Sequence, residues 1–399
     1  MQQTQSATDK KLISLMVLLV LFSPLAIDIY LPALPLIASE FQVSSTLTQD
    51  TITWFMFSMG LGQLLAGPLA DRYGRRVIAL AGIVIYGTSS ALAWQAMSID
   101  MLLLARLLQG FGACATAVAA FSAVRDSYSA ERSGQMISYL NGAICFIPAL
   151  APILGSWLTH HMGWRANFSF MAAFALVGLV LIYLGFKETR PSNTDTSGHL
   201  ISPSRYFSII KNPQFLFHAS LCMLAMSVIL AYVTTAPVLL MGKLGLSMEA
   251  FTSWFSVNAV FNIAACMLAP KLMEKYGSRK ALYLGLYATV FAGGLMLAFS
   301  HINEAWAFMV PIFVSSIGFA CVLGSAAGKA LAPFSDRAGT AAALLGLFQM
   351  SGAGLVVSTM QRMHLEPSHY LTLQMWLLLP AILLLGSQAG KRWHSVGEC

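Results

Sequence analysis

Twelve apolar runs constrain this sequence more than any other feature, because each is long enough to cross about 30 Å of hydrocarbon as a helix. The chain of 399 residues is 57% hydrophobic and only 10% charged, whereas soluble domains are about 25% charged. The sequence therefore predicts an all-α membrane protein with twelve transmembrane helices. We place them at residues 12–38, 47–69, 77–97, 102–123, 136–158, 165–186, 213–235, 251–270, 280–299, 305–327, 339–360 and 370–388.

The distribution of Lys and Arg predicts which ends of these helices face the cytoplasm. If both termini are cytoplasmic, 19 of the 23 basic residues lie in segments on that side, and only Arg165, Lys243 and Arg362 lie in outer segments. Cytoplasmic loops of membrane proteins carry such an excess of Lys and Arg. We therefore expect both termini to be cytoplasmic. The same distribution accounts for the net charge of +7 without a nucleic-acid partner.

A short charged island, GPLADRYGRR, separates the second and third apolar runs at Gly67–Arg76. Proline removes a helix donor and clashes with the preceding turn, so we expect Gly67 and Pro68 to end the second helix. Arg and Asp cost roughly 2.5–3.5 kcal/mol each at the centre of a membrane helix. The island is therefore predicted to be a tight cytoplasmic loop, and its charged residues are Asp71, Arg72, Arg75 and Arg76.

The island has a second copy, PKLMEKYGSRK at Pro270–Lys280, in which Gly277 aligns with Gly74 at an offset of 203 residues. Residues 131–134 and 336–339 align at an offset of 205 residues. Similar offsets of half the chain indicate an internal duplication, which many transporter folds show. Residues 187–212 are polar and contain two prolines, as is typical of a linker. We predict two six-helix bundles related by pseudo-two-fold symmetry, at 1–186 and 213–399, with a cytoplasmic linker at 187–212.

Two ionisable side chains are expected deep within the apolar runs. Asp28 lies in AIDIYLPALP, and Arg106 lies in LLLARLLQGFGA. Both are about 24 Å from the cytoplasmic end of their helices at 1.5 Å per residue, so we expect them at similar depth in the outer half. An ionisable residue in a membrane helix is a functional candidate by default, and a buried structural ion pair is the alternative. Arg stays protonated, so Asp28 is predicted to be the titrating group.

Within the fifth run, the stretch Asn141–Ser156 has the composition of a bent and closely packed helix. It contains Pro148 and Pro152, which can bend a helix, and small residues such as Gly155, which allow close contact between helices. An ordinary kinked helix is the alternative. Neither a metal-ligand spacing nor a nucleotide fingerprint after a strand is present in the sequence. We therefore predict neither a metal nor a cofactor.

Together these motifs resemble the major facilitator superfamily. GPLADRYGRR resembles its motif between the second and third helices, and LARLLQGFGA resembles its fourth-helix motif around an arginine. The proline-rich fifth helix is similar to the antiporter motif of its drug exporters. IDIYLPALP, VRDSY and KETRP resemble the Bcr/CflA group of drug:proton antiporters, and NGAICFIPALAPILG and TTAPVLLM look closest to the MdtL-like members of that group.

The resemblance implies a proton-coupled antiporter of a bacterial inner membrane that exports small, largely apolar compounds by alternating access, as multidrug or chloramphenicol- and bicyclomycin-like exporters do. It implies proton coupling by Asp28 and Arg106, and an antiporter motif at Pro148, Pro152 and Gly155. The gating motif that it implies comprises Gly67, Asp71, Arg72, Gly74, Arg75, Arg76, Arg125 and Asp126. For the substrate cavity we expect Asp28, Tyr30, Asn141, Phe146, Tyr232, Asn258 and Gln349, and for the assembly we expect a monomer.

The sequence departs from the family pattern at three positions. Ala151 precedes Pro152 where the antiporter motif usually has glycine, and Ser156 replaces a second glycine. Val20 stands where some relatives have a second acid, so we expect one proton per cycle and poor export of dications. Export of an endogenous metabolite or siderophore is an alternative function. The competing classes are a passive channel or sensor and a membrane-embedded enzyme, which would need a cluster of catalytic groups at one depth.

Overall fold

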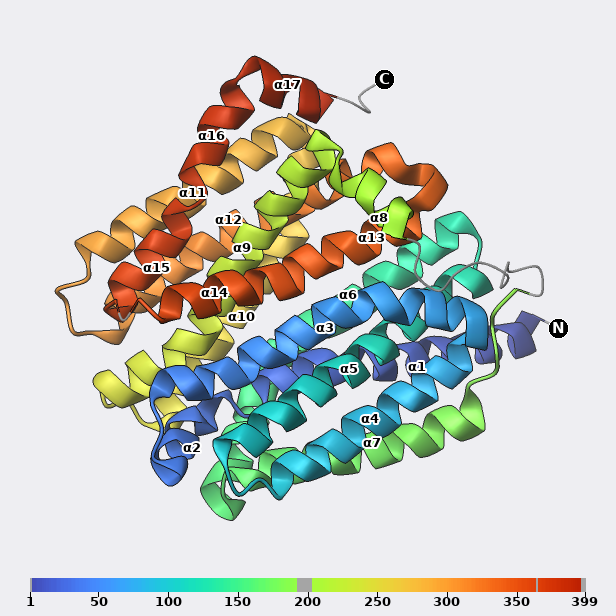
Figure 1. The fold of residues 1–399 in the computed structure, drawn as a ribbon, viewed down its shortest axis with the longest axis horizontal. Coiled ribbons are helices and arrows are strands. Elements are labelled where there is room, and N and C mark those ends of the chain that lie inside the picture. Colours follow the sequence, from blue (N-terminus) through green and yellow to red (C-terminus); the bar gives the residue numbers. More distant parts are fainter. Residues whose placement is uncertain (1, 192–202, 364, 396–399) are drawn as a thin grey trace. The chain divides into compact units, whose positions relative to one another are not determined.

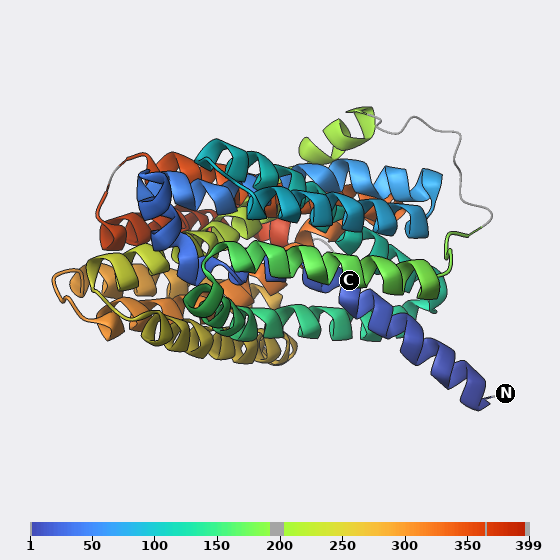
Figure 2. The ribbon, with the colours of Figure 1, turned by 90° about the horizontal axis from the view of Figure 1, so that it is seen from below.

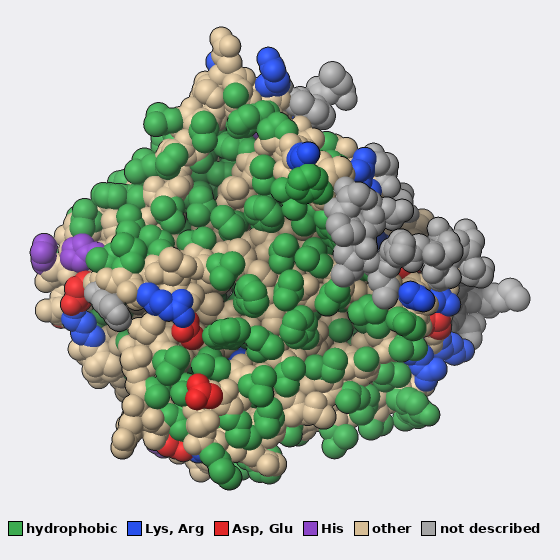
Figure 3. All heavy atoms as spheres, in the orientation of Figure 1, with side chains coloured by type: hydrophobic (Ala, Val, Ile, Leu, Met, Phe, Trp, Pro, Cys, Tyr) green, Lys and Arg blue, Asp and Glu red, His purple; other side chains and the backbone are tan. Residues whose placement is uncertain are grey.

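The computed structural model describes residues 2–191, 203–363 and 365–395, so residues 192–202 of the predicted linker lie outside the described residues. Within the described part, twelve helical segments are long and apolar enough to cross a membrane, which confirms the predicted number. Figure 3 shows that hydrophobic side chains predominate on the visible surface and that charged side chains are sparse. The segments are Lys11–Phe41, Ser45–Tyr73, Arg75–Trp94, Ile99–Ser127, Arg132–Met162, Arg165–Gly185, Pro213–Lys243, Met248–Tyr276, Ser278–Ala298, Ala305–Phe334, Ala338–Gln361 and Pro367–Gly386.

The chain forms two compact units, Met1–Ile201 and Ser202–Cys399. In the first unit, α5 packs against α1, α3 and α4, while α4 also packs against α7, and α1 against α6 (Figures 1 and 2). Helix α7 also packs against α1 and α6, so α4, α7, α6 and α1 contact one another in that order. The elements of this unit are α1 (Gln2–Asp28), η1 (Leu31–Ala33), α2 (Leu34–Phe41), α3 (Ser45–Tyr73), α4 (Arg75–Trp94), α5 (Ile99–Ser127), α6 (Ala130–Met162) and α7 (Arg165–Gly185).

The second unit repeats this packing pattern. Here α12 packs against α9, α10 and α11, while α11 packs against α15, and α9 against η4 and α14 (Figure 1). The repeat that the two charged islands indicate is therefore present in the helix contacts. The elements are α8 (Pro203–Ile210), α9 (Pro213–Pro237), η2 (Val238–Lys243), α10 (Met248–Tyr276), α11 (Ser278–Ala298), α12 (Ala305–Leu331), η3 (Ala332–Arg337), α13 (Ala338–Leu347), η4 (Phe348–Gly352), α14 (Ala353–Gln361), α15 (Pro367–Trp376), α16 (Leu379–Gly386) and α17 (Gln388–Ser395).

Two glycines at equivalent positions of the repeat have the same backbone conformation. Gly74, between α3 and α4, has φ +102° and ψ 154°, and Gly277, between α10 and α11, has φ +83° and ψ 152°. Only glycine adopts positive φ at low cost. The aligned glycines of the two islands therefore make the same turn, so the duplication extends to single residues.

Two predicted helix boundaries are wrong. Gly67 and Pro68 do not end the second helix, because α3 continues through Pro68 as far as Tyr73. The last turn of α3 carries charged residues and can lie in water, beyond the hydrocarbon. Pro68 lacks a backbone N–H, and a membrane helix tolerates the loss of this one hydrogen bond. Conversely, the first predicted helix does not run unbroken over residues 12–38, because α1 ends at Asp28 and the one-turn 3₁₀ helix η1, which contains Pro32, precedes α2.

Candidate functional site

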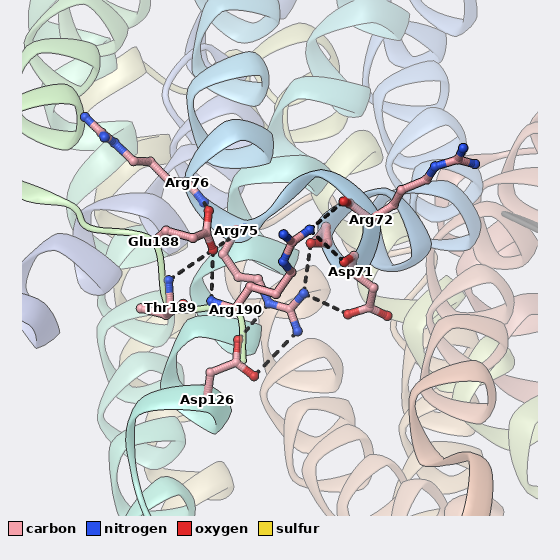
Figure 4. Close-up of polar contacts among 9 residues, drawn as sticks. Asp71, Arg72, Arg75, Arg76, Asp126, Glu188, Thr189 and Arg190 are labelled. Atoms are coloured by element: carbon pink, nitrogen blue, oxygen red, sulfur yellow. Dashed lines mark hydrogen bonds and ion pairs between the residues drawn. The ribbon is translucent and has the colours of Figure 1, made fainter. Parts of the chain in front are cut away.

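The charged island in the first unit is centred on Arg75. The side chain of Arg75 is only 7% exposed and lies between two carboxylates (Figure 4). Its Nη1 is 2.8 Å from Asp71 Oδ1, and its Nε donates to Asp126 Oδ2 at 2.7 Å. Arg75 Nη1 also donates to the carbonyl of Ala70 at 2.8 Å. One arginine therefore joins the end of α3 to the end of α5.

A second set of contacts comes from the segment that follows α7. Glu188 accepts backbone N–H bonds from Arg75 at 2.9 Å and from Arg76 at 3.2 Å (Figure 4). These N–H groups are in the first turn of α4 and have no partner within the helix. Arg190 Nη1 donates to the carbonyls of Asp71 at 3.3 Å and Arg72 at 2.5 Å, in the last turn of α3. We call Glu188 and Arg190 the clasp.

The clasp places each charge where a helix favours it. A carboxylate is stabilised at the N-terminus of a helix and a guanidinium at the C-terminus. Partial burial of Glu188 would raise its pKa, but N–H donors from Arg190, Arg75, Arg76 and Thr189 outweigh this effect and hold the pKa below its usual range. Gly74 has positive φ, and a Cβ there would displace the Glu188 carboxylate from its present position. The loop is therefore held by charge, hydrogen bonds and close approach together.

The side chains of the other predicted gating residues lie outside this network, although the backbone carbonyl of Arg72 accepts from Arg190. Arg125 is exposed on α5 and forms no hydrogen bond or ion pair with the described residues, although it precedes Asp126. Arg72 is exposed, and its guanidinium lies 5.8 Å from the ring centroid of Tyr73. At Gly67, no neighbouring atom lies within 4 Å of an added Cβ. The structure therefore brings together Asp71, Gly74, Arg75, Arg76 and Asp126, but not Gly67 or Arg125.

The equivalent island in the second unit keeps one of these contacts. Arg76 Nη2 donates to the carbonyl of Tyr183 at 2.7 Å, and its repeat equivalent, Arg279, donates to the carbonyl of Leu385 at 3.0 Å. Ser278 occupies the position equivalent to Arg75, and Glu274, equivalent to Asp71, is exposed. The second unit therefore keeps the contact of Arg279 with a backbone carbonyl, but it has no arginine at the position equivalent to Arg75.

Arg106 is completely buried in the first unit, with 0% exposure. Its Nε donates to the carbonyl of Thr51 at 3.3 Å, and its Nη1 donates to Gln109. The guanidinium lies 4.7 Å from the ring centroid of Tyr30 and 4.5 Å from that of Phe55. Among the described residues it has no carboxylate partner, and Nη2 has no hydrogen-bond partner. Buried charges are costly without a counterion, so this arginine is a strong functional candidate.

Asp28 lies two residues before Tyr30, the residue on which Arg106 stacks. It is the last residue of α1, it is 4% exposed, and its carboxylate makes no hydrogen bond or ion pair in the described part of the chain. The structure thus places Asp28 two residues from a ring that contacts Arg106, but it does not pair the Asp28 and Arg106 side chains. A carboxylate at a helix break can change its environment with little backbone cost.

Gly155 explains how the break in α1 is packed. A Cβ added at Gly155 would overlap the carbonyl oxygen of Ile29, the residue after Asp28. Glycine at this position therefore allows α6 to lie directly on the broken segment. Pro148 and Pro152 lie within α6, which is continuous from Ala130 to Met162. Ala151, in the place of the usual glycine, is buried at 3% exposure.

The residues expected to line a substrate cavity differ in their surroundings. Asn141 and Phe146 are exposed on α6, whereas Tyr30 is buried and its hydroxyl is 2.8 Å from Thr51 Oγ1. In the second unit, the ring of Tyr232 stacks on that of Phe255 at 5.5 Å, and Asn258 accepts a hydrogen bond from Ser316 at 3.1 Å. Gln349 lies in the π-helical turn η4, which interrupts the helical segment 338–361.

Sequence reasoning missed the roles of Glu188, Arg190 and the hydrogen-bonding partners of Arg106. Glu188 and Arg190 lie in KETRP, which had significance only as part of the family resemblance. An acid and a base two residues apart after a helix are common, and nothing local shows that they contact a loop more than 100 positions away. Gln109, three residues after Arg106, could have been found from the helical i, i+3 spacing.

Comparison with known proteins agrees with the fold and the motifs. Residues 16–357 match the family model of the Major Facilitator Superfamily. The chain is 32% identical to the multidrug resistance protein MdtL of Citrobacter koseri, over 84% of this chain and 85% of that protein. It is also 32% identical to MdtL of Escherichia coli O127:H6, with the same coverage.

Solved structures support the fold alone, since their sequences are distant. A D-xylose–proton symporter is 16% identical with a TM-score of 0.73, covering 95% of this chain and 96% of that one. A bacterial homologue of the human lysosomal transporter Spinster is 18% identical with a TM-score of 0.76, covering 98% of both chains. With twelve helical segments among its described residues that are long and apolar enough to cross a membrane, and a family match over most of its length, the chain is a multi-pass membrane protein and belongs to the major facilitator superfamily.

Proposed function

We propose that this protein is a proton-coupled antiporter that exports small, largely apolar compounds by alternating access. Family membership and the likeness to MdtL multidrug resistance proteins support export as its function. The observation that carries proton coupling is Asp28, a buried carboxylate without an ion pair among the described residues, at a break in α1. An intramembrane carboxylate of this kind is the expected site for proton binding.

In this proposal Asp28 and Arg106 have different roles: Arg106 provides a fixed positive charge, and Asp28 binds and releases the proton. Arg106 remains a fixed cation, because guanidinium does not lose its proton in proteins. Asp28 binds a proton in one facing state and releases it in the other, since a change in its distance from Arg106 alters the stability of the carboxylate. The broken backbone beside Gly155 provides the place where that distance changes.

The cluster around Arg75 is proposed to be the cytoplasmic gate. Its ionic contacts at the ends of α3, α4 and α5 form a unit that either remains intact or is broken, as a two-state gate requires.

We further propose that both termini are cytoplasmic, that 187–212 is the cytoplasmic linker between bundles 1–186 and 213–399, and that the protein resides in a bacterial inner membrane as a monomer. It is a transporter rather than an enzyme and has no nucleic-acid partner.

Everted membrane vesicles provide the test. Vesicles from cells expressing the protein are acidified inside by respiration, and candidate compounds are then added outside. A compound that is transported inward should release protons, reported by a pH-sensitive dye, and an Asp28→Asn variant should not. A drug-susceptibility panel on an efflux-deficient host supplies the candidates. Transport that ignores an imposed pH gradient would contradict proton coupling.

A further inference from the structure

A compact polar cluster lies at the end of the first unit opposite the gate. Glu40, near the end of α2, accepts a hydrogen bond from Trp164 Nε1 at 2.5 Å and another from Arg165. The guanidinium of Arg165 lies 4.3 Å from a ring centroid of Trp164 and donates to the carbonyl of Ala96 at 2.8 Å. Glu40, Trp164 and Arg165, which we call the outer cluster, therefore join α2, the α4–α5 connection and the α6–α7 connection.

A column of aromatic rings leads from the outer cluster into the core. Trp164 contacts Phe168 edge-on with ring centroids 5.9 Å apart, and Phe168 contacts Tyr30 at 5.3 Å. Tyr30 in turn lies 4.7 Å from the Arg106 guanidinium. Trp164 is 4% exposed, and Phe168 and Tyr30 are 0% exposed. The contacts are therefore continuous from the outer end of the unit to its buried cation.

The inner end of the column fixes Arg106 in two ways. Tyr30 stacks on the guanidinium, and its hydroxyl lies 2.8 Å from Thr51 Oγ1. The carbonyl of the same threonine accepts the bond from Arg106 Nε. Buried side chains are packed at crystal-like density, so a displacement of one ring is transmitted to its neighbours. A shift of Tyr30 must therefore change the surroundings of Arg106.

We propose that Glu40 and Arg165 are positioning residues for the buried Arg106–Tyr30 pair, acting through the Trp164–Phe168 column. The inference rests on the proposed function, in which Arg106 and Asp28 are the coupling groups. The outer cluster holds α2, and α2 directly follows η1 and the Asp28 break. Loosening the cluster should therefore loosen the break and slow the coupled step, while the affinity for substrate in the resting state stays nearly the same.

The second unit contains a matched control. Lys243 Nζ is 2.5 Å from Glu366 Oε2, and this pair occupies nearly equivalent repeat positions, with the charges exchanged. The side chains are 52% and 62% exposed, compared with 34% for Arg165 and 44% for Glu40. No ring contact among the described residues joins Lys243 or Glu366 to the core of their unit. Glu366→Gln therefore removes a similar ion pair without an aromatic column.

The first experiment measures positioning without transport. Amide hydrogen exchange is followed in the purified full-length protein over residues 28–34. Glu40→Gln should raise exchange there about fivefold, as expected for weakened local stability, and Trp164→Phe, which keeps the ring but removes Nε1, should have a similar effect. Glu366→Gln should cause no change. Unchanged exchange in Glu40→Gln and Trp164→Phe would overturn the proposal.

The second experiment measures the consequence for transport in proteoliposomes. Glu40→Gln should lower the maximal rate several-fold with little change in KM. Combining Glu40→Gln with Trp164→Phe should be no worse than the stronger single change, because both act through one column. If exchange responds while the rates do not, the cluster is merely structural and the proposal fails. If wild type moves no compound, the proposed function fails, while the exchange result still decides whether the cluster positions the break.

Discussion

The backbone N–H of Arg75 donates to Oε1 of Glu188 at 2.9 Å, which ties the first residue of α4 to the segment after α7. The same residue, Arg75, carries the guanidinium that bridges Asp71 and Asp126. Glu188 therefore holds the backbone of the residue whose side chain forms the proposed gate. The geometry of the gate depends on a residue that lies outside the charged island itself.

The low pKa of Glu188 predicts how stability depends on pH. A carboxylate whose folded pKa is depressed stabilises the fold fully above its unfolded pKa of about 4.3, and this contribution is lost as pH falls through the lower folded value. We expect Glu188→Gln to lower the thermal midpoint at neutral pH, with the difference from wild type shrinking as the medium is acidified below about pH 4.3. Thermal unfolding in detergent tests this, with the exposed Glu274→Gln as the control. A difference that stays constant on acidification would contradict it.

Comparing Gly74→Ala with Gly277→Ala should separate the cost of positive φ from the cost of the contact with Glu188. Both substitutions put a side chain at positive φ with ψ near 150°, a region that is essentially restricted to glycine and costs an L-residue about 1–3 kcal/mol. At Gly74 the added Cβ also overlaps the Glu188 carboxylate, whereas at Gly277 nothing lies within 4 Å of it. We therefore expect Gly74→Ala to be more destabilising, and combining it with Glu188→Ala should remove the excess. Equal destabilisation by the two single substitutions would show that the clasp adds nothing.

Asp28→Asn should abolish proton-coupled export while leaving the protein folded. Asn has nearly the same shape as Asp and cannot bind or release a proton in the physiological range. Because the Asp28 carboxylate has no ion pair among the described residues, its removal leaves no partner unsatisfied. The expected result is a normal thermal midpoint with no transport driven by a pH gradient. Full activity of Asp28→Asn would assign proton coupling to another residue.

Arg106→Ala should impair transport more than Arg106→Lys. Lysine keeps the positive charge but lacks the planar fork that serves Thr51 and Gln109 together. Alanine also leaves the buried side-chain oxygen of Gln109 without its donor, at about 1–3 kcal/mol. The comparison requires initial rates of transport and expression levels for both variants. Normal transport by Arg106→Ala would show that the buried cation has no coupling role.

The presence of one predicted titrating acid within the spans leads to a prediction about stoichiometry. Exchange of one proton for one neutral molecule moves one charge, worth about 2.3 kcal/mol per 100 mV, and each pH unit adds about 1.36 kcal/mol. A potential of ~100 mV with half a pH unit then gives ~3 kcal/mol, or a gradient of roughly a hundredfold. A monovalent cation gains only the pH contribution, and dications should be poor substrates.

Proteoliposomes in which the potential and the pH gradient are imposed separately provide the measurement for this prediction. Neutral compounds should respond to both gradients, and monovalent cations only to the pH gradient. Efficient dication export against an opposing potential would require a second proton site, and neutral transport indifferent to potential would also contradict the one-proton cycle.

The number of spans and the repeat were predictable because they depend on local chemistry. Runs of apolar residues set the helix count, and the aligned glycines Gly74 and Gly277 marked the same turn in both halves. Pro68 misled the prediction, since a proline near an aqueous helix end does not have to stop the helix. The break after Asp28 was missed although Pro32 and Pro35 follow it, because proline is tolerated in membrane helices and the run is otherwise apolar.

The site was predictable only in part. Asp28 and Arg106 stood out as charges in apolar runs, but the sequence suggested that they pair, whereas Arg106 stacks on Tyr30 and Phe55 instead. Rings offer a buried cation a favourable face, and sequence alone does not say whether a carboxylate or a ring will lie closer. The clasp depends on tertiary contacts, which have no local signal in KETRP.

The clasp also determines when, during synthesis of the chain, the α3–α4 loop can acquire its hydrogen bonds. Glu188 and Arg190 follow their partners in the α3–α4 loop by 112 to 119 positions. When the ribosome has made α3 and α4, the first amides of α4 and the last carbonyls of α3 still lack these partners. The loop acquires them only after α7 has been inserted and residue 190 has left the exit tunnel. A nascent chain halted before Glu188 would therefore carry every residue of the charged island with its gate unfinished.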